Sequence, residues 1–195
     1  MQHAADPFDR FEAWFAEATA SEPSDPNALA LATVDARGRP SVRTVLMKGR
    51  DRHSIVFYTN LCSAKADALA AHPHAEALFH WKSLKRQVRM NGPVASVDDA
   101  EADTYYATRP RLSRLGAWAS FQSRPMESRA MFEARLAEID ARFPGEETPR
   151  PPFWSGFRLT PETIEFWEDR EGRLHERERF TATVTGGWRS QLLFP

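Results

Sequence analysis

The sequence predicts a mainly β α+β fold, in which short strands form one barrel-like sheet flanked by helices. Three observations support this prediction. The length of 195 residues fits one compact domain with a terminal extension. Short β-type runs separated by polar, turn-rich segments occur both before and after a helical stretch. Strands, a helical insertion and further strands in one chain favour a single antiparallel sheet over alternating βαβ units.

The N-terminal region, residues 1–24, is expected to contain one helix and a linker, and residues 25–195 the barrel domain. Phe8, Phe11, Trp14 and Phe15 recur at helical spacing, which predicts an amphipathic helix over residues 8–19. The sequence SEPSDPN, at residues 21–27, then ends the helix because its prolines and small polar residues favour turns.

The first half of the barrel domain reads as an antiparallel meander of three strands, at residues 28–34, 40–48 and 54–60. Ser63 is a suitable N-cap for an alanine-rich helix that ends near His72. Two more strands follow at residues 76–81 and 87–97. The first of them is nearly all apolar and is therefore expected to be central.

A helical insertion is expected at about residues 98–143. Asp98 can cap a helix that runs through Ala107, and Pro110 should break it. A short helix follows over residues 113–120, and a longer one carries Phe132 and Phe143. Strands then return at residues 153–161, 162–168, 173–184 and 188–194.

Composition and charge exclude several classes of protein. Hydrophobic residues make up 42% and charged residues 27%, which is typical of globular chains and not of disordered or fibrous ones. The net charge of -1 indicates neither a nucleic-acid partner nor an acidic membrane. No signal-peptide pattern is present at the start, and no apolar run reaches the roughly 18 residues that a membrane span needs. We therefore expect a cytoplasmic protein that binds neither nucleic acid nor a membrane.

The strongest local signal is the charged run RLHERER at residues 173–179. On one strand, Arg173, His175, Arg177 and Arg179 would share a face, where they would repel one another unless an anion or carboxylates neutralise them. The pattern alone favours a solvated strand balanced by neighbouring glutamates, and an anion site is the alternative.

Cations also lie at both ends of the apolar strand at residues 43–48. Strand parity places Arg43 and Lys48 on opposite faces, so one ligand could contact both only if a bulge changes the register. Ser63 and Lys65 stand at a predicted helix start, where free N–H groups and a lysine can bind phosphate. An ordinary surface strand and a simple N-cap are the alternatives.

Tyr105, Arg109 and Ser113 recur every four residues and could converge on one anion, although Pro110 prevents a single continuous helix. No metal site is expected, since no cysteine or carboxylate completes a set with His72, His74 and His80. No two glycines form a G-x-G pair, so a nucleotide cofactor would be bound without the dinucleotide fingerprint or the Walker loop.

Taken in order, the strings RTVLMK, FYTN, SAK, RQVR, YYATRPRLSRLGAWAS, QS, FWSGFR, IEFW and RLHER resemble the pyridoxine/pyridoxamine 5′-phosphate oxidase family. The resemblance runs from about residue 25 to residue 195. It implies an FMN-binding split β-barrel and a homodimer with both active sites at the subunit interface. It also implies the oxidation of pyridoxine 5′-phosphate and pyridoxamine 5′-phosphate to pyridoxal 5′-phosphate by O2, which releases H2O2, and NH3 from the amine.

The resemblance also assigns roles to residues. In this family a hydride passes from C4′ of the substrate to N5 of the flavin, with Arg173 and His175 as the catalytic pair. The substrate contacts implied are Lys48, Tyr105, Arg109, Ser113, Arg173 and His175. The FMN contacts implied are Arg43, Thr44, Val45, Leu46, Met47, Lys48, Tyr58, Thr59, Lys65, Gln87, Gln122, Ser123, Trp167 and Arg177.

The chain departs from the family pattern in three places. Ala64 stands where many members have a basic residue, so one FMN phosphate contact is expected to be lost or supplied elsewhere. Glu176 replaces the usual aspartate, which is a mild change. Many members begin with a longer basic segment that folds over the substrate, and we expect this lid to be missing here.

Two other functions are open at this point. A flavin oxidase of the related phenazine-pathway branch acts on an aromatic carboxylate and would not need the phosphate set of Tyr105, Arg109 and Ser113. A non-catalytic flavin- or haem-binding split barrel would lack Arg173 and His175. Both sets are present, which favours the phosphate oxidase.

Overall fold

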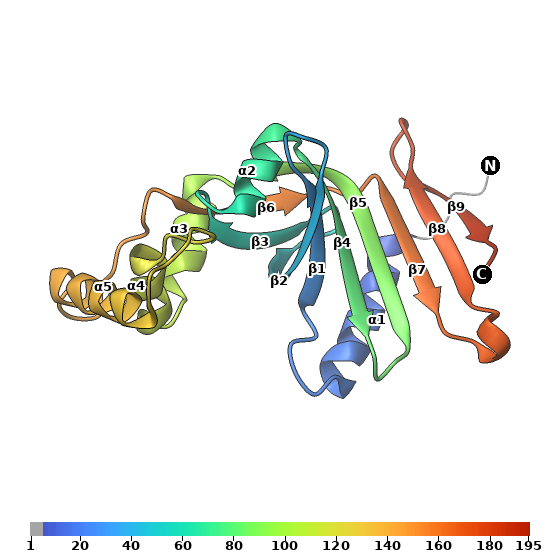
Figure 1. Ribbon diagram of the computed structural model, residues 1–195. Helices are drawn as coiled ribbons and strands as arrows, with labels where there is room; N and C mark the ends of the chain where they lie inside the picture. Colours follow the sequence, from blue (N-terminus) through green and yellow to red (C-terminus); the bar gives the residue numbers. More distant parts are fainter. Residues whose placement is uncertain (1–5) are drawn as a thin grey trace.

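The structure is a computed structural model that describes residues 6–195. The start of the chain, where the expectation of a missing lid falls, lies outside the described residues. Within residues 6–195 the chain forms nine strands and five α-helices (Figure 1). No helix in this range is long and apolar enough to span a bilayer.

Helix α1 (Pro7–Ser21) confirms the predicted N-terminal helix. The side chain of Asp6 caps it by accepting a hydrogen bond from the backbone N–H of Phe8 at 2.9 Å, and a proline follows at the first helical position. Phe8, Phe11 and Trp14 form its buried stripe and pack into the core of the barrel. This helix therefore closes one side of the sheet.

Six antiparallel strands form a closed barrel. Their order is β4-β1-β2-β3-β6-β5, and β4 also pairs with β5, which completes the circle. Strand β4 thus has a partner on each side, as its apolar sequence predicted. The barrel strands are β1 (Ala28–Val34), β2 (Pro40–Arg50), β3 (Ile55–Asn60), β4 (His74–Trp81), β5 (Arg86–Ser96) and β6 (Trp154–Leu159).

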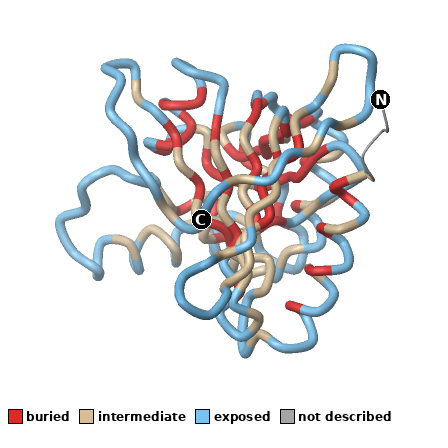
Figure 2. Tube along the Cα trace, turned by 90° about the vertical axis from the view of Figure 1, so that its right-hand side faces the viewer, coloured by how far each residue is buried: buried red, intermediate tan, exposed pale blue. Residues whose placement is uncertain are grey.

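Three further strands extend the sheet beyond the barrel. They are β7 (Thr163–Glu168), β8 (Glu176–Ala182) and β9 (Trp188–Leu193), and β7 pairs with β5. The buried segments are concentrated in the strands, while loops and turns are exposed (Figure 2). Large aromatic side chains such as Phe57, Phe79 and Trp81 fill the core, where each stabilises the fold by roughly 2–3 kcal/mol. The predicted α+β, mainly β fold with flanking helices is confirmed.

Helix α2 (Ala64–Ala71) follows β3, and three more helices lie between β5 and β6: α3 (Asp99–Ala107), α4 (Arg111–Ala119) and α5 (Arg129–Arg142). The side chain of Asp98 caps α3 as predicted, and Pro110 separates α3 from α4. Helices α4 and α5 extend away from the barrel (Figure 1), and α5 has no fully buried residue.

The prediction of one strand over residues 173–184 is wrong at its start. Residues Glu171–Arg173 form a single turn of 3-10 helix, and β8 begins only at Glu176. Gly172 and Arg173 have φ values of 66° and 62°, so two successive residues in the left-handed region reverse the chain. Arg173 and His175 both precede β8, so the predicted row of Arg173, His175, Arg177 and Arg179 on one strand face is not formed.

Candidate functional site

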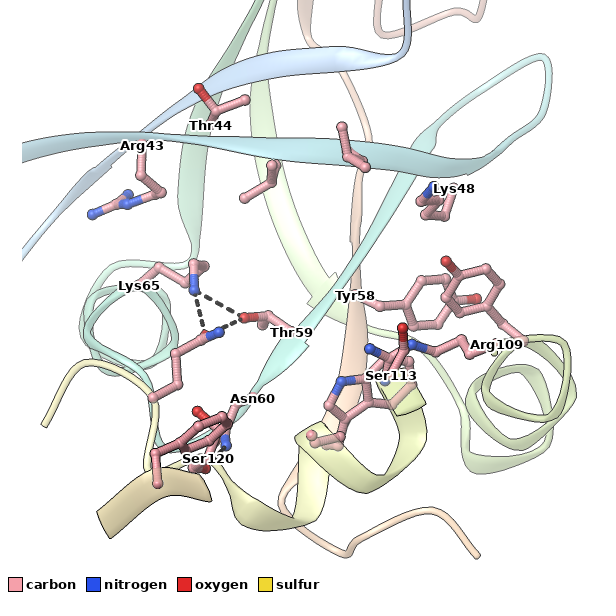
Figure 3. Close-up of a pocket in the computed structure, with 18 residues that line it drawn as sticks. Arg43, Thr44, Lys48, Tyr58, Thr59, Asn60, Lys65, Arg109, Ser113 and Ser120 are labelled. Atoms are coloured by element: carbon pink, nitrogen blue, oxygen red, sulfur yellow. Dashed lines mark hydrogen bonds between the residues drawn. The ribbon is translucent and has the colours of Figure 1, made fainter. Parts of the chain in front are cut away.

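A large cavity, about 610 Å³, lies between strands β2 and β3 and the helices α3 and α4 (Figure 3). Four of its lining residues are cations and none is a carboxylate. Such a cavity favours an anionic ligand, because the four positive charges have no acidic partner within it. The residues that line it are Arg43, Thr44, Val45, Leu46, Lys48, Tyr58, Thr59, Asn60, Lys65, Tyr105, Arg109, Ser113, Gly116, Ala117, Ser120, Gln122, Phe132 and Trp154.

Lys65 stands at the start of α2 and is only 9% exposed. Its Nζ donates hydrogen bonds to Thr59 Oγ1 at 2.9 Å and to Gln122 Oε1 at 2.8 Å (Figure 3). It also donates to Ser63 Oγ at 3.2 Å. All three acceptors are neutral, and burial, aided by the charge of Arg43, lowers the pKa of Lys65 to about 8. Ser63 is the N-cap residue as predicted, but its side chain makes no capping bond and accepts from the lysine instead.

Arg43 and Lys48 both line the cavity, although strand parity alone would separate them. The pairing between β2 and β3 shifts register between Met47 and Gly49, so Lys48 lies at the irregularity. The structure therefore supports the bulge that the sequence reasoning required. The Arg43 guanidinium donates to the hydroxyls of Thr33 and Ser41 and has no carboxylate partner among the described residues.

Tyr105, Arg109 and Ser113 converge on this cavity from α3, the linker and α4. Burial lowers the pKa of Arg109, and its Nη1 atom is buried with no hydrogen-bond partner within the described residues. Since a buried unpaired donor is costly, this atom marks a place where a ligand oxygen would fit. The predicted convergence is thus present despite the break at Pro110.

Tyr58, Tyr105 and Trp154 form an aromatic stack along one wall of the cavity. The rings of Tyr58 and Tyr105 lie 4.1 Å apart, and those of Tyr58 and Trp154 lie 5.4 Å apart at an angle of 5°. Burial raises the pKa of Tyr58 to about 12, so its hydroxyl stays protonated at neutral pH. Gly156 makes room for Tyr58, because a Cβ there would lie 2.7 Å from the tyrosine ring.

Arg173 and His175 line a second cavity, of about 350 Å³, near the turn between β7 and β8. The imidazole of His175 lies 4.6 Å from the ring of Trp167, and its Nδ1 lies 3.0 Å from Asp169 Oδ1. The backbone N–H of Arg170 also donates a hydrogen bond to this nitrogen at 3.4 Å, so contacts from Asp169 and Arg170 hold the ring orientation. His80, Lys82 and Lys85 complete the lining of this cavity.

Gln87, Trp167 and Arg177 are in register across β5, β7 and β8, and so share one face of the sheet. Arg177 donates from Nε and Nη2 to Glu165 Oε1, at 3.0 and 2.7 Å. The other oxygen of Glu165 accepts from Arg179 at 2.9 Å. Glu165 is buried, and the sequence reasoning missed it because β7 carries two glutamates and the sequence alone does not show which of them is buried.

The predicted site residues thus fall into two groups. The two cavities share no lining residue, and in Figure 1 the β7–β8 turn lies at the opposite end of the sheet from α3 and α4. Of the two remaining predicted contacts, Met47 is buried in the core. Ser123 lines a neighbouring cavity of about 300 Å³, beside Gln122. Sequence reasoning also missed six residues of the large cavity: Asn60, Gly116, Ala117, Ser120, Phe132 and Trp154.

Comparison with known proteins identifies the family. Residues 15–143 match the family described as pyridoxamine 5′-phosphate oxidase, and residues 154–195 match the pyridoxine 5′-phosphate oxidase C-terminal dimerisation region. The chain belongs to the pyridoxine/pyridoxamine 5′-phosphate oxidase family. The predicted resemblance is confirmed.

Curated relatives named pyridoxine/pyridoxamine 5′-phosphate oxidase are similar over nearly the whole chain. The Sphingopyxis alaskensis protein is 60% identical over 97% of this chain and 88% of its own length. The Novosphingobium aromaticivorans protein is 56% identical over 98% of this chain and 94% of its own length. Membership of this oxidase family makes the chain an enzyme.

Solved structures agree on the fold. PhzG from Burkholderia lata 383, in complex with tetrahydrophenazine-1-carboxylic acid, is 30% identical with a TM-score of 0.92, over 98% of this chain and 94% of that chain. A pyridoxamine 5′-phosphate oxidase-related, FMN binding protein from Nostoc punctiforme PCC 73102 has a TM-score of 0.79 at 22% identity, covering 98% of this chain and all of its own. The barrel is therefore that of this family.

Proposed function

We propose that this chain is an FMN-dependent oxidase that converts pyridoxine 5′-phosphate and pyridoxamine 5′-phosphate to pyridoxal 5′-phosphate, with O2 as the electron acceptor. The observation that carries the proposal is the large cavity, in which Arg43, Lys48, Lys65 and Arg109 meet without a carboxylate. A cofactor and a substrate that each carry a phosphate would supply the missing negative charge. The names of the curated relatives support the same substrates.

The residues present fit FMN at one end of this cavity. Lys65 is a buried ammonium held only by neutral acceptors, and Arg43 contacts only neutral acceptors as well. Backbone N–H groups at the start of α2 add to the positive potential there. We assign Lys65 and Arg43 to the FMN phosphate. Bound FMN would supply the acceptor for two electrons and pass them to O2, which yields H2O2.

The substrate phosphate is assigned to the other end, at the junction of α3 and α4. Arg109 offers a guanidinium with an unpaired donor, and Tyr105 and Ser113 add two hydroxyls. Lys48 adds a further charge from β2. These groups would fix the position of the substrate, which is the main catalytic task of the protein when the cofactor carries the chemistry.

Two subunits are needed to complete this site. Arg173 and His175, the proposed catalytic pair, lie at the far end of the sheet from Arg109 in the same chain. A homodimer brings the second group of one protomer to the large cavity of its partner, and the match of residues 154–195 to a dimerisation region supports this arrangement. Asp169 would keep the imidazole of His175 oriented toward the substrate.

A phenazine-type flavin oxidase is the second candidate, because the similar PhzG structure holds a phenazine carboxylic acid. The unpaired Arg109 donor beside the hydroxyls of Tyr105 and Ser113 favours a dianionic phosphate over a carboxylate. The higher identity to the curated oxidases, 60% against 30%, favours the same choice.

The proposal is tested by purifying the protein, recording its flavin absorbance, and supplying each phosphorylated vitamer in air while aldehyde and peroxide are measured. We expect a yellow protein that forms both products. Arg173→Ala should abolish most turnover and leave FMN bound, whereas Lys65→Ala should weaken FMN retention. A protein that binds no FMN and oxidises neither vitamer would overturn the proposal, and wild-type kinetics in Arg173→Ala would remove the role assigned to that residue.

A further inference from the structure

We propose that Trp154 is a positioning residue for the substrate phosphate, one that holds Arg109 and Tyr105 in place and leaves the charge of Arg109 free for the ligand. The inference rests on the function proposed above and deepens it. It assigns a role to a residue of β6 that lies in the FWSGFR string but is absent from the substrate and FMN contacts that the resemblance implies.

Arg109 is held by aromatic rings and not by a carboxylate. Its Cζ atom lies 4.7 Å from the centre of the Trp154 ring and 5.5 Å from that of Tyr106. Both distances are within the range of a cation–π contact. No ion pair to Arg109 occurs within the described residues, and its Nη1 atom is buried without a partner.

Arg86 shows the usual alternative in the same chain. Its guanidinium lies 4.5 Å from the ring of Trp14, but it also bonds Glu17 at 2.7 Å and Glu168 at 3.0 Å. Two carboxylates thus neutralise Arg86, which is a structural residue. An arginine that rests only on rings keeps its full charge and its free donors for an incoming anion.

Trp154 is itself firmly fixed. Its side chain is buried, and its backbone carbonyl accepts a hydrogen bond from Arg150 Nη1 at 2.8 Å. Arg150 in turn bonds Asp99 and Asp103 of α3, so β6 and α3 are tied together at this point. The tryptophan ring is therefore set at a constant distance from the helix that carries Tyr105.

The same ring orders Tyr105. The Trp154 and Tyr105 rings lie 6.2 Å apart at 12°, and the ring of Tyr58 packs against both of them. One side chain thus supports both the guanidinium and one of the hydroxyls assigned to the phosphate. Loss of the ring would let both groups relax, which weakens phosphate binding more than it affects the reacting end of the substrate.

The test compares Trp154→Leu and Trp154→Phe with the wild type, each loaded with FMN. We expect Trp154→Leu to raise KM for pyridoxine 5′-phosphate about tenfold with kcat changed by less than about twofold. Inhibition by inorganic phosphate should weaken by about the same factor, and the Kd for FMN should stay within about twofold. Trp154→Phe, which keeps a ring, should retain most of the phosphate affinity.

Trp14→Leu is the matched control, because it removes a buried tryptophan and a cation–π contact outside the cavity. It should destabilise the fold without changing KM or the inhibition by phosphate. A fall in kcat at constant KM in Trp154→Leu, or parallel losses of FMN and phosphate affinity, would overturn the positioning role.

If the wild type oxidises neither vitamer, the proposed function fails. Phosphate-induced thermal stabilisation still tests the role of the tryptophan, because Trp154→Leu should need about ten times more phosphate than the wild type for the same shift.

Discussion

Replacing Lys65 by methionine should stabilise the flavin-free protein at neutral pH and weaken its binding of FMN. The ammonium of Lys65 is buried against Thr59, Ser63 and Gln122, which carry no charge. Burial lowers the pKa of Lys65 to about 8, which means that the folded protein bears a cost for keeping this group charged. Methionine has a similar length and no charge, so it removes that cost.

The size of the effect follows from the pKa. A fall from 10.5 to about 8 corresponds to at most about 3 kcal/mol of unfolding free energy. The expected gain in stability is smaller, about 1–2 kcal/mol at pH 7, because Lys65 keeps some contact with solvent and methionine cannot make the hydrogen bonds of the lysine. Below pH 8 both the folded and the unfolded wild type carry the proton, so the cost is fully present. Between pH 8 and 10.5 the folded state loses its proton first, so the stability of the wild type rises with pH.

The assay is urea denaturation of the flavin-free wild type and Lys65→Met at pH 7 and pH 9.5, with a titration of FMN at pH 7. The advantage of the variant should shrink by about 1–2 kcal/mol at the higher pH, and its FMN affinity at pH 7 should be lower than that of the wild type. Lys82→Met, at an exposed lysine, is the control for stability and should leave the free energy of unfolding unchanged at both pH values. This reasoning would be refuted if Lys65→Met were less stable than the wild type at pH 7, its stability changed with pH as that of the wild type does, and its FMN affinity were unchanged.

Two further substitutions test the sheet and the aromatic wall. Glu165→Ala leaves Arg177 and Arg179 without their shared carboxylate, so it should lower the free energy of unfolding in urea by about 2–4 kcal/mol. Glu165→Asp should lower it less. A loss below about 0.5 kcal/mol in Glu165→Ala would contradict the role of this carboxylate. Gly156→Ala places a Cβ 2.7 Å from the Tyr58 ring, so it should lower the free energy of unfolding by about 1–3 kcal/mol and raise KM for the phosphorylated vitamers. An unchanged KM would show that the aromatic stack does not shape the site.

Hydrophobic periodicity was enough to predict most of the fold. The alternation of apolar residues located the strands, and the caps and prolines located the helix ends, as at Asp98 and Pro110. The turn at Arg173 was missed, because a non-glycine residue with φ of 62° has no local sequence signal of its own. Strand propensity therefore placed the start of the predicted strand at Arg173, three residues before its true start at Glu176.

The site could be predicted only in part. The four-residue spacing of Tyr105, Arg109 and Ser113 was visible in the sequence, and the structure brings the three together. The support of Arg109 by Trp154 depends on contacts between distant segments, and single-sequence patterns do not report such contacts. Parity likewise separated Arg43 from Lys48, and only the register shift in β2 explains why both line one cavity.

The central claim is that each site combines the large cavity of one protomer with Arg173 and His175 of its partner, and subunit complementation tests it most directly. Arg109→Ala and Arg173→Ala proteins are each expected to be inactive. After the two are mixed in equal amounts and allowed to exchange subunits, half of the dimers are mixed, and each of these contains one intact site. Oxidation of pyridoxine 5′-phosphate should then recover to about a quarter of the wild-type rate. No recovery after proven subunit exchange would contradict the claim, because it would place both residues in the site of a single chain.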